Sequence, residues 1–421
     1  MQMIIDYFKE ICSIPHCSFD SDKLMNFLVD FAKSRGYEIH TDEAKNIYIT
    51  KGSPVICLQA HYDMVCVGDA PNIEPIEIDG FIKAKNSSLG ADNGIAIAMM
   101  MVLMDEQKEV EFLITANEEV GLVGANGVDF ALRSNYMLNL DSEEEGEICI
   151  GCAGGVDIKA TKKLKKISNT FECYEVSLSD LPGGHSGVDI DKNIPNALIE
   201  LAKFLKDKNI KIIKFKGGER INSIPANAKA IVACDMKPES EDGFSIRRVE
   251  KYDYCYDENV IQIISDFKHG VLEFNESLNI PNISQNLAIV DIADDILSIE
   301  VSIRAMSMDD LDRTSKETSE YFKSFGFEVE KKDKYPAWKP EVNDFVKKIE
   351  EIMRAQLGKS EIKAIHAGLE CGVLKQKYPK MKFASIGPTI HFPHSKQEMV
   401  EISTVYSTFK VANRIINEFE K

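Results

Sequence analysis

The hydrophobic and polar positions of the chain follow two successive patterns. Over the first 160 residues, short apolar runs alternate with stretches of helical period. Strands that alternate with helices are typical of an α/β domain whose sheet is mostly parallel and carries helices on both faces. The apolar runs predict strands at 46–50, 54–60, 111–116 and 136–141, and the helical stretches predict helices at 23–35, 91–104 and 125–132.

From about residue 174 the order of elements changes. This region predicts a smaller α+β domain with two related halves, each containing a helix between strands. The polar segment 238–290 permits no assignment, and the proline-containing segment 335–340 is expected to lead back to the first domain. The predicted strands are 175–179, 211–217, 228–235, 294–305 and 327–335, and the predicted helices are 196–207 and 309–325.

A helix at 342–358, a strand at 382–387 and a final helix complete the first domain. We therefore expect one domain of residues 1–173 and 336–421, with residues 174–335 as a domain inserted into it. A chain of 421 residues is long enough for two hydrophobic cores, which fits this division.

Composition excludes several classes of partner. A net charge of −18 argues against a nucleic-acid partner, because phosphate binding needs a clustered positive face. No apolar run approaches the roughly 18 residues that span a bilayer, so no membrane association is expected. The N-terminus lacks the pattern of a secretory signal. The ten cysteines are scattered, several within apolar runs, so we expect them to be reduced and buried in a cytoplasmic protein. The single CxxC at 149–152 has no second pair, which disfavours a redox or metal role.

Acidic and histidine side chains follow the ends of the predicted strands. His61 and Asp63 come after the strand 54–60, and residues two apart on a strand point to the same side. Glu118 and Glu119 follow the strand 111–116. Since ligands bind at the carboxyl ends of strands in open α/β sheets, these groups are expected to converge.

Two further carboxylates join this set. Asp141 follows the apolar part of the strand, residues 136–140, and Asp92 opens the helix at 91–104. Each residue alone has an ordinary alternative: Asp92 could cap its helix, Glu118 and Glu119 could be an exposed pair, His61 could be a hydrogen-bonded core histidine, and Asp141 could begin a solvated acidic loop. Their common location at strand ends instead predicts a metal site.

Two histidines near the C-terminus lie on a loop that contains glycine and proline. His394 is the better ligand candidate, and His391 is expected to be a neighbour of the site.

Seven motifs of the chain resemble those of the co-catalytic metallopeptidases of the M20 class. They are HYDMV, LGADNG, ANEEVGLVGA, NLDSEE, GGHSG, HAGLECG and IGPTIHFPHS. Within this class the chain is most similar to the aminoacyl-histidine dipeptidases, also called cytosolic non-specific dipeptidases. The resemblance runs through almost the whole chain, and HAGLECG and IGPTI-x-x-PHS are its specific parts. It implies a catalytic first domain and an inserted lid or dimerisation domain, in a homodimer that hydrolyses small peptides.

The resemblance also implies a ligand set for two Zn²⁺ ions bridged by Asp92. His61 and Asp141 would complete one site, while Glu119 and His394 would complete the other. Mn²⁺ or Co²⁺ can use the same nitrogen and oxygen ligands. Asp63 would orient His61, and the peptide bond between Asp92 and Asn93 would be cis.

The three ligand carboxylates and a bridging hydroxide balance the four charges of two Zn²⁺ ions. Glu118 would act as a general base that removes a proton from a water molecule to give this hydroxide, and it would then protonate the leaving amine. His185 in GGHSG would stabilise the tetrahedral oxyanion and would come from the partner subunit in a dimer, although an incidental histidine in a glycine-rich turn is the alternative.

Three residues are candidates for binding the two ends of the substrate. Asn222 and Arg304 would hold the terminal carboxylate, with a structural salt bridge as the alternative for Arg304. Glu370 would bind the amino group. The chain is shorter than the relatives in its inserted domain and carries His391 at a variable position, which leaves the substrate preference open.

Alternative functions use the same metal core. The expected activity is hydrolysis of unblocked dipeptides, including Xaa-His. An N-acyl amino-acid deacylase or a tripeptidase is the second enzymatic possibility. A catalytically silent peptide- or metal-binding protein is the third, and it is disfavoured because Glu118 and every ligand are present.

Overall fold

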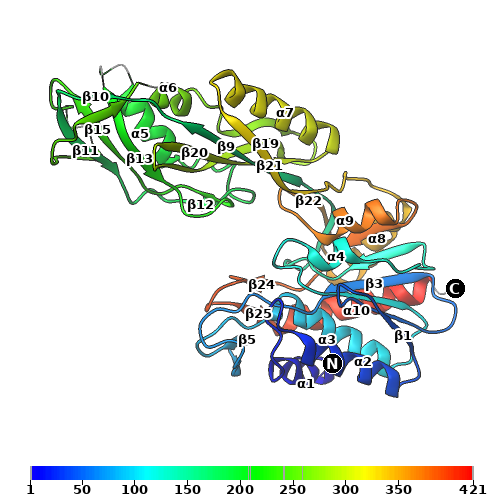
Figure 1. Cartoon of the computed structure of the whole chain (residues 1–421). Helices are drawn as coiled ribbons and strands as arrows, with labels where there is room; N and C mark the ends of the chain where they lie inside the picture. Colours follow the sequence, from blue (N-terminus) through cyan, green and yellow to red (C-terminus); the bar gives the residue numbers. More distant parts are fainter. Residues whose placement is uncertain (1, 207, 209, 240–241, 258, 420–421) are drawn as a thin grey trace. The chain divides into compact units, whose positions relative to one another are not determined.

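The computed structural model describes residues 2–206, 208, 210–239, 242–257 and 259–419. Residue 207, the last residue of the helix predicted at 196–207, lies outside the described residues. The chain divides into two compact units. Unit 1 consists of Met1–Gly151, Trp338–Ala364 and Leu369–Lys421, and unit 2 consists of Cys152–Ala337 and Ile365–Gly368 (Figure 1).

Unit 1 is built on an eight-stranded sheet in the order β1-β2-β6-β3-β7-β23-β8-β22. The central strands β6, β3, β7 and β23 are parallel to one another, as predicted, whereas β1, β2 and β8 pair antiparallel. Every residue of β3 and β6 is buried, as is typical of central strands covered on both faces. The strands are β1 Glu38–Thr41, β2 Ile47–Thr50, β3 Ile56–His61, β6 Glu111–Thr115, β7 Tyr136–Asn139, β8 Glu147–Cys152, β22 Glu361–Ile365 and β23 Lys382–Ser385.

Helices cover this sheet, and the central one is apolar on all sides. From Ala91 to Met104 every residue of α3 is buried, because the helix packs between the sheet and α1. At Gly94 an added Cβ would lie 3.3 Å from the ring of Phe8, so the two helices approach closely there (Figure 1). The helices are α1 Gln2–Cys12, α2 Asp22–Ser34, α3 Ala91–Asp105, α4 Val123–Gly127, α8 Asp344–Leu357, α9 Glu370–Lys377 and α10 Ile402–Phe419. The helix predicted at 125–132 is therefore shorter, since Val128 takes an extended conformation.

A small four-stranded sheet, which the sequence did not predict, lies beside the start of α3. Its order is β24-β25-β5-β4, and its pairs are antiparallel. It joins chain segments more than 300 residues apart, since Met399 of β25 pairs with Lys83 of β5. The strands are β4 Pro75–Ile78, β5 Phe81–Ala84, β24 Ile390–His391 and β25 Met399–Glu401.

Unit 2 contains an antiparallel eleven-stranded sheet with its own hydrophobic core. Its main path runs β16-β11-β15-β13-β19-β20-β9-β21, with β10, β17 and β18 attached to it. The strands of unit 2 are β9 Gly154–Lys163, β10 Lys166–Ser168, β11 Glu172–Leu178, β12 Gly184–His185, β13 Lys211–Gly217, β14 Ser223–Ile224, β15 Ala228–Cys234, β16 Phe244–Arg248, β17 Tyr254–Tyr256, β18 Gly270–Asn275, β19 Ile280–Ala293, β20 Ile296–Ala305 and β21 Glu328–Tyr335. The separate β12 and β14 form a two-stranded ladder.

Local capping defines where the helices of unit 2 start. The Asn196 side chain accepts hydrogen bonds from two backbone amides at the start of α5, and Ser307 accepts one at the start of α7. These two helices pack on the sheet, α6 packs against α5, and the arrangement corresponds to the predicted α+β architecture. Their bounds are α5 Ala197–Leu205, α6 Val260–Ser265 and α7 Met308–Ser324.

The predicted domain boundaries differ from the observed ones. Unit 2 begins at Cys152 instead of residue 174, because β9 pairs with β20 and β21 and thus belongs to the second sheet. The return falls after Ala337 instead of residue 335, and the short segment Ile365–Gly368 also belongs to unit 2.

The cysteine prediction was wrong for one pair. Cys17 and Cys66 form a disulfide, whereas the other eight cysteines, including Cys149 and Cys152, are buried and form none. The pair escaped notice because its members are 49 residues apart and lie on loops. Within the described ranges, no helix is long and apolar enough to cross a membrane.

Candidate metal centre and substrate-binding residues

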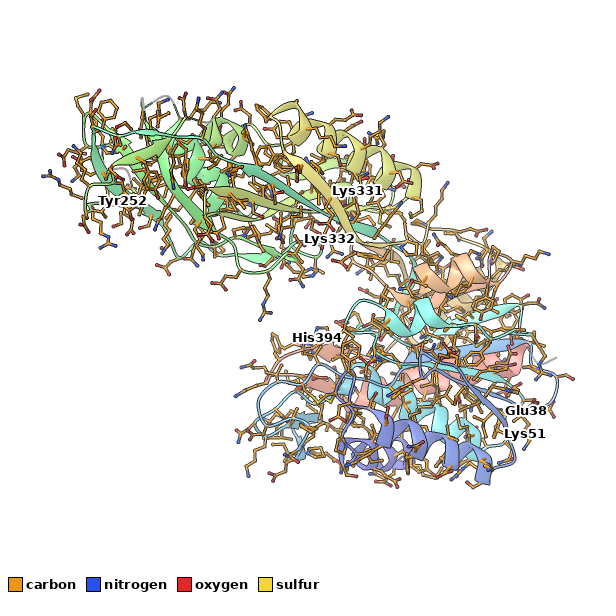
Figure 2. All side chains as sticks on the ribbon, in the orientation of Figure 1. Glu38, Lys51, Tyr252, Lys331, Lys332 and His394 are labelled. Carbon is orange, nitrogen blue, oxygen red and sulfur yellow. A yellow bond between two sulfur atoms is a disulfide. The ribbon has the colours of Figure 1, made fainter. Side chains whose placement is uncertain are left out.

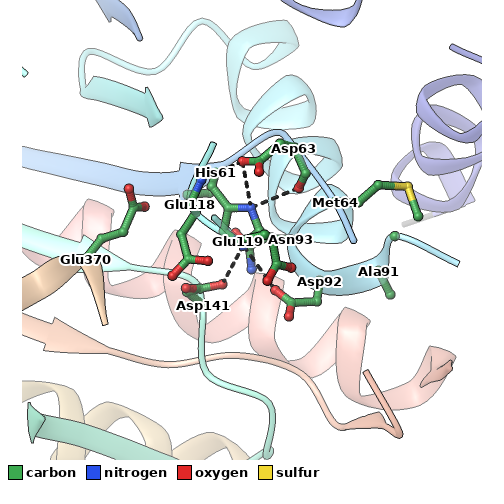
Figure 3. A network of polar contacts seen from close by, with 12 residues as sticks. His61, Asp63, Met64, Ala91, Asp92, Asn93, Glu118, Glu119, Asp141 and Glu370 are labelled. Atoms are coloured by element: carbon green, nitrogen blue, oxygen red, sulfur yellow. Dashed lines mark hydrogen bonds and ion pairs between the residues drawn. The ribbon is translucent and has the colours of Figure 1, made fainter. Parts of the chain in front are cut away.

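The carboxyl ends of three adjacent strands in unit 1 bring the predicted site residues together. His61 is the last residue of β3, Glu118 and Glu119 follow β6, and Asp141 follows β7. Asp92 lies in the first turn of α3 at the same edge (Figure 3). This convergence is what the parallel order of β6, β3 and β7 produces, because parallel strands end at one edge of the sheet.

Asp92 lies between two histidines. Its Oδ1 is 3.1 Å from Nε2 of His61, and its Oδ2 is 3.1 Å from Nε2 of His394. A second carboxylate accompanies each histidine: Asp141 Oδ1 is 3.4 Å from His61, and Glu119 Oε1 is 2.9 Å from His394. In each of these two groups of three residues, one ligand atom per residue lies within 4.8 Å of the others. The arrangement can hold two cations with Asp92 between them.

His394 reaches this group from a loop of unit 1. It lies between β24 and β25, and its side chain is about half exposed, at 48% (Figure 2). The neighbouring His391 packs against Phe81, with 5.9 Å between the centroids of the two rings. It belongs to neither group, in keeping with its predicted place beside the site. The peptide bond between Asp92 and Asn93 is cis, as the resemblance implied.

Asp63 holds several parts of the centre in place. Nδ1 of His61 lies 3.0 Å from the backbone oxygen of Asp63 and 3.5 Å from its carboxylate (Figure 3). A proton on Nδ1 leaves the Nε2 lone pair facing Asp92 and Asp141. The Asp63 carboxylate also accepts hydrogen bonds from the Ser18 hydroxyl, at 2.7 Å, and from the backbone N–H of Glu118, at 2.9 Å. It therefore links the histidine to the two glutamates.

The crowding of acidic groups shifts their pKa values. Burial lowers the pKa of His61, but the carboxylates of Asp141, Asp63 and Asp92 outweigh this effect and raise it well above its ordinary value. Burial raises the pKa of Asp141 to about 6, with Asp92 and Glu119 adding to the effect. Buried carboxylates that oppose one another's ionisation form a strong site for a cation, whose charge stabilises all of them as anions.

Glu118 differs from its neighbour Glu119. It belongs to neither of the two groups around Asp92, although it lies near His61 and Glu119. Burial raises its pKa well above the ordinary value, and the nearby Asp141, Glu370 and Glu119 add to this shift. Glu118 lies beside the candidate ligands but belongs to neither group around Asp92, so its carboxylate is suited to exchange protons.

Glu370 is a fully buried carboxylate at the start of α9. Its Oε2 accepts hydrogen bonds from Gln59 Nε2 and Thr115 Oγ1, both at 2.6 Å. Its Oε1 has no hydrogen-bond partner among the described residues. Burial raises its pKa to about 7. Gln59 and Thr115 were missed from the sequence, although Gln59 is two residues before His61 on β3 and so lies on the same side.

The predicted residues of unit 2 surround a glycine-rich loop. His185 ends β12, and its Nδ1 accepts hydrogen bonds from the backbone N–H groups of Gly187 and Val188, at 3.2 and 3.1 Å. This fixes the ring and leaves Nε2 to carry the proton of a neutral imidazole. The backbone oxygen of Asn222 accepts a hydrogen bond from the N–H of Ser186 at 2.9 Å, so Asn222 adjoins the same loop.

Arg304 lies beside this loop within unit 2. It is 8% exposed, and its Nη1 donates to the Tyr335 hydroxyl at 2.6 Å. Among the described residues its Nε has no hydrogen-bond partner. A Cβ on Gly187 would lie 3.2 Å from that Nε and 2.6 Å from the backbone oxygen of His366, so only glycine permits this approach. His366, which the sequence did not single out, pairs its Nε2 with Ser284 Oγ at 2.7 Å.

Comparison with known proteins identifies the class. Residues 57–418 match the model of peptidase family M20/M25/M40, and the chain belongs to this family of peptide hydrolases. It is similar to the cytosol non-specific dipeptidase of Escherichia coli, with 32% identity over 99% of this chain and 97% of the relative.

Solved structures agree with this assignment. The aminoacylhistidine dipeptidase of Vibrio alginolyticus superposes with a TM-score of 0.86 at 28% identity, covering 99% of this chain and 96% of that one. An aminopeptidase PepT from Bacillus cereus has a TM-score of 0.63 at 18% identity, covering 100% and 99% of the two chains, and shares the fold.

Proposed function

We propose that the protein is a dinuclear metallo-dipeptidase that hydrolyses unblocked dipeptides, Xaa-His among them. The observation that carries the proposal is Asp92, whose two oxygens each face a histidine that is accompanied by a further carboxylate. The similarity to two named dipeptidases over almost the whole chain supports the substrate class.

The ligand residues fit two Zn²⁺ ions, with His61, Asp92 and Asp141 at one site and Asp92, Glu119 and His394 at the other. Imidazole and carboxylate ligands suit Zn²⁺, and Mn²⁺ or Co²⁺ can replace it. Three carboxylates leave two divalent ions with one net positive charge. Such ions would activate a water molecule and polarise the scissile carbonyl.

The protein residues around this centre would then position and move protons. Glu118 accepts a proton from the attacking water and passes it to the leaving amine, because its carboxylate lies beside the ligands and belongs to neither group around Asp92. Asp63 keeps the proton of His61 on Nδ1, which preserves Nε2 as a ligand.

Further residues would bind the two ends of the substrate. Glu370, in unit 1, offers to the free amino group its Oε1, which has no hydrogen-bond partner in the part of the chain that the structure describes. In unit 2, Arg304 and Asn222 bind the terminal carboxylate, and Nε2 of His185 donates a hydrogen bond to the developing oxyanion. We further propose a cytoplasmic homodimer in which His185 acts on the substrate of the partner subunit.

The test is a panel of dipeptides, their N-acetylated forms and tripeptides, incubated with chelated and zinc-restored protein. Zinc-dependent cleavage of only the free dipeptides is expected. Cleavage of only the acetylated compounds would assign the protein to the deacylases, and a preference for tripeptides would assign it to the tripeptidases. No hydrolysis despite two bound ions would indicate a binding protein.

A further inference from the structure

Glu398 is a buried carboxylate that binds the backbone of the loop before Asp92. It is 2% exposed and lies immediately before β25. Its Oε2 accepts hydrogen bonds from the N–H groups of Leu89 and Gly90, at 2.7 and 3.1 Å. Its Oε1 accepts from the N–H groups of Ala91 and Asp92, at 2.8 and 3.3 Å. One side chain therefore satisfies four consecutive backbone donors.

These donors depend on Glu398 because the first amides of a helix have no preceding turn to accept their hydrogen bonds. The loop is also closed to solvent, since Leu89 and Ala91 are 0% exposed. Gly90 adopts a left-handed conformation with φ of 72°, and an added Cβ would lie 2.8 Å from the sulfur of Met64. The loop thus has one conformation and one acceptor, and a negative charge at a helix N-terminus is favourable.

The same segment of chain also supplies His394. The two residues are four positions apart, and the N–H of Glu398 donates to the backbone oxygen of Ser395 at 3.2 Å. His394 contacts the Asp92 carboxylate from one side, while Glu398 holds the backbone of Asp92 from the other. The strand β25, paired with β24 and β5, anchors both.

We propose that Glu398 is a positioning residue of the metal centre, which sets the place of Asp92 through the backbone amides of residues 89–92. This inference rests on the proposed metal-binding role of Asp92. Because Asp92 faces both histidines, a displaced loop weakens the binding of two ions together. Loss of an ordinary buried carboxylate lowers stability and leaves metal affinity unchanged.

Glu111 provides the matched control for this difference. It is also a fully buried carboxylate of unit 1, and it accepts hydrogen bonds from the backbone N–H groups of Arg133 and Ser134, at 2.8 and 2.9 Å, and from the Tyr48 hydroxyl. It starts β6, whereas Glu118 and Glu119 follow the other end of that strand.

The experiment compares wild type, Glu398→Gln, Glu398→Asp and Glu111→Gln as full-length apoproteins. Each is titrated with Co²⁺ in the presence of a competing chelator, and the visible absorption spectrum and thermal midpoint are recorded. Glu398→Gln replaces one acceptor oxygen by a donor, so we expect roughly 10- to 100-fold weaker binding of both ions and an altered spectrum. Glu398→Asp keeps the charge with a shorter reach and should lose less affinity. Glu111→Gln should lose thermal stability and keep wild-type binding.

Two results would overturn the inference, and they are distinguishable. If wild type binds two Co²⁺ ions and both Glu398 variants bind them with the same affinities and spectrum, Glu398 does not position the centre. If Glu398→Gln does not fold, Glu398→Asp decides the same question. If wild type itself binds no metal, the proposed metal centre fails and this inference fails with it.

Discussion

The two units place their polar residues in different ways. In unit 1, three parallel strands end side by side, and residues at their ends form one cluster of carboxylates and histidines with Asp92 of α3 and His394 of the loop between β24 and β25. In unit 2, antiparallel strands point in alternate directions, and the candidate residues come from a two-residue strand, a loop and the C-terminal end of β20. The parallel sheet gathers the groups at its three strand ends by topology, whereas unit 2 needs a specific loop with Gly187 to bring His185 beside Arg304.

This comparison predicts different consequences of mutation. Substitutions at the strand ends of unit 1 should affect the chemical step or metal binding. Substitutions around the loop of unit 2 should affect substrate contacts and leave the metals in place.

The largest effect is expected for Glu118→Gln. The amide cannot accept a proton from water, so kcat should fall by about 10²–10⁴-fold while two ions remain bound. Turnover and metal content, measured on the same sample, test this. Glu119→Gln is the control, because loss of a ligand should lower metal content at one site. Metal loss in Glu118→Gln and not in Glu119→Gln would reverse the roles of the two glutamates.

His185→Ala is expected to lower kcat by about 10²–10³-fold with the metals retained, because an oxyanion donor is removed. Mixing it with Glu118→Gln under conditions of subunit exchange tests the origin of His185. If the residue acts across a dimer, random exchange yields one intact site in half of the dimers and about a quarter of wild-type activity. If verified mixed dimers recover no activity, His185 acts on the substrate bound by its own subunit.

The comparison of the units also explains which features were predictable from the sequence. Most candidate ligands of unit 1 were predicted because they stand at the end of an apolar strand, and apolar runs are visible locally. Asp92 joined this set from the start of a helix, and His394 was assigned from the resemblance. The carboxylate of Glu398 was not, because its four partners lie more than 300 residues away in the chain. Ser18, which binds Asp63, and the disulfide between Cys17 and Cys66 were missed because their partners are also distant in the chain, at separations of 45 and 49 residues.

The missed parts of the fold have a related cause. The strands β16 and β18 carry mostly exposed or half-exposed side chains, so the segment 238–290 shows no apolar period. The boundary of unit 2 was placed too late because β9 follows β8 almost directly, and the change of sheet leaves no mark in composition. Pairing partners determine both features, and they are distant in sequence.

A smaller effect is expected for Arg304→Lys. Lysine lacks the planar fork that binds a carboxylate through two hydrogen bonds, so KM for a dipeptide should rise about tenfold with kcat nearly unchanged. A dipeptide amide has no carboxylate and should show the same KM in wild type and variant. Arg313→Lys, at an exposed arginine of unit 2 paired with Glu273 and Asp310, is the control. An equal rise in KM for the amide would indicate general damage to unit 2.

The smallest effect concerns the stability of unit 2 and its pH dependence. Burial, together with the charge of Arg304, lowers the pKa of His366 to about 3. The unfolded chain has a histidine pKa of about 6.5, so it binds the additional proton first. The stabilisation by neutral His366 is complete above pH 6.5 and declines as the pH falls towards 3. Between pH 7 and pH 5 the loss should be about 2 kcal/mol.

Urea unfolding of chelated wild type, His366→Asn and the exposed-site control His40→Asn, at pH 7 and pH 5, tests this expectation. The stability difference between wild type and His366→Asn should shrink on acidification by more than the difference between wild type and His40→Asn. Circular dichroism reports both units, and the single tryptophan, Trp338, is buried in unit 1. A pH-dependent change confined to circular dichroism would show that the proton acts on unit 2 alone. The same change in tryptophan fluorescence would mean that the two units unfold together. The units would then differ in the topology of their sheets but would not unfold independently.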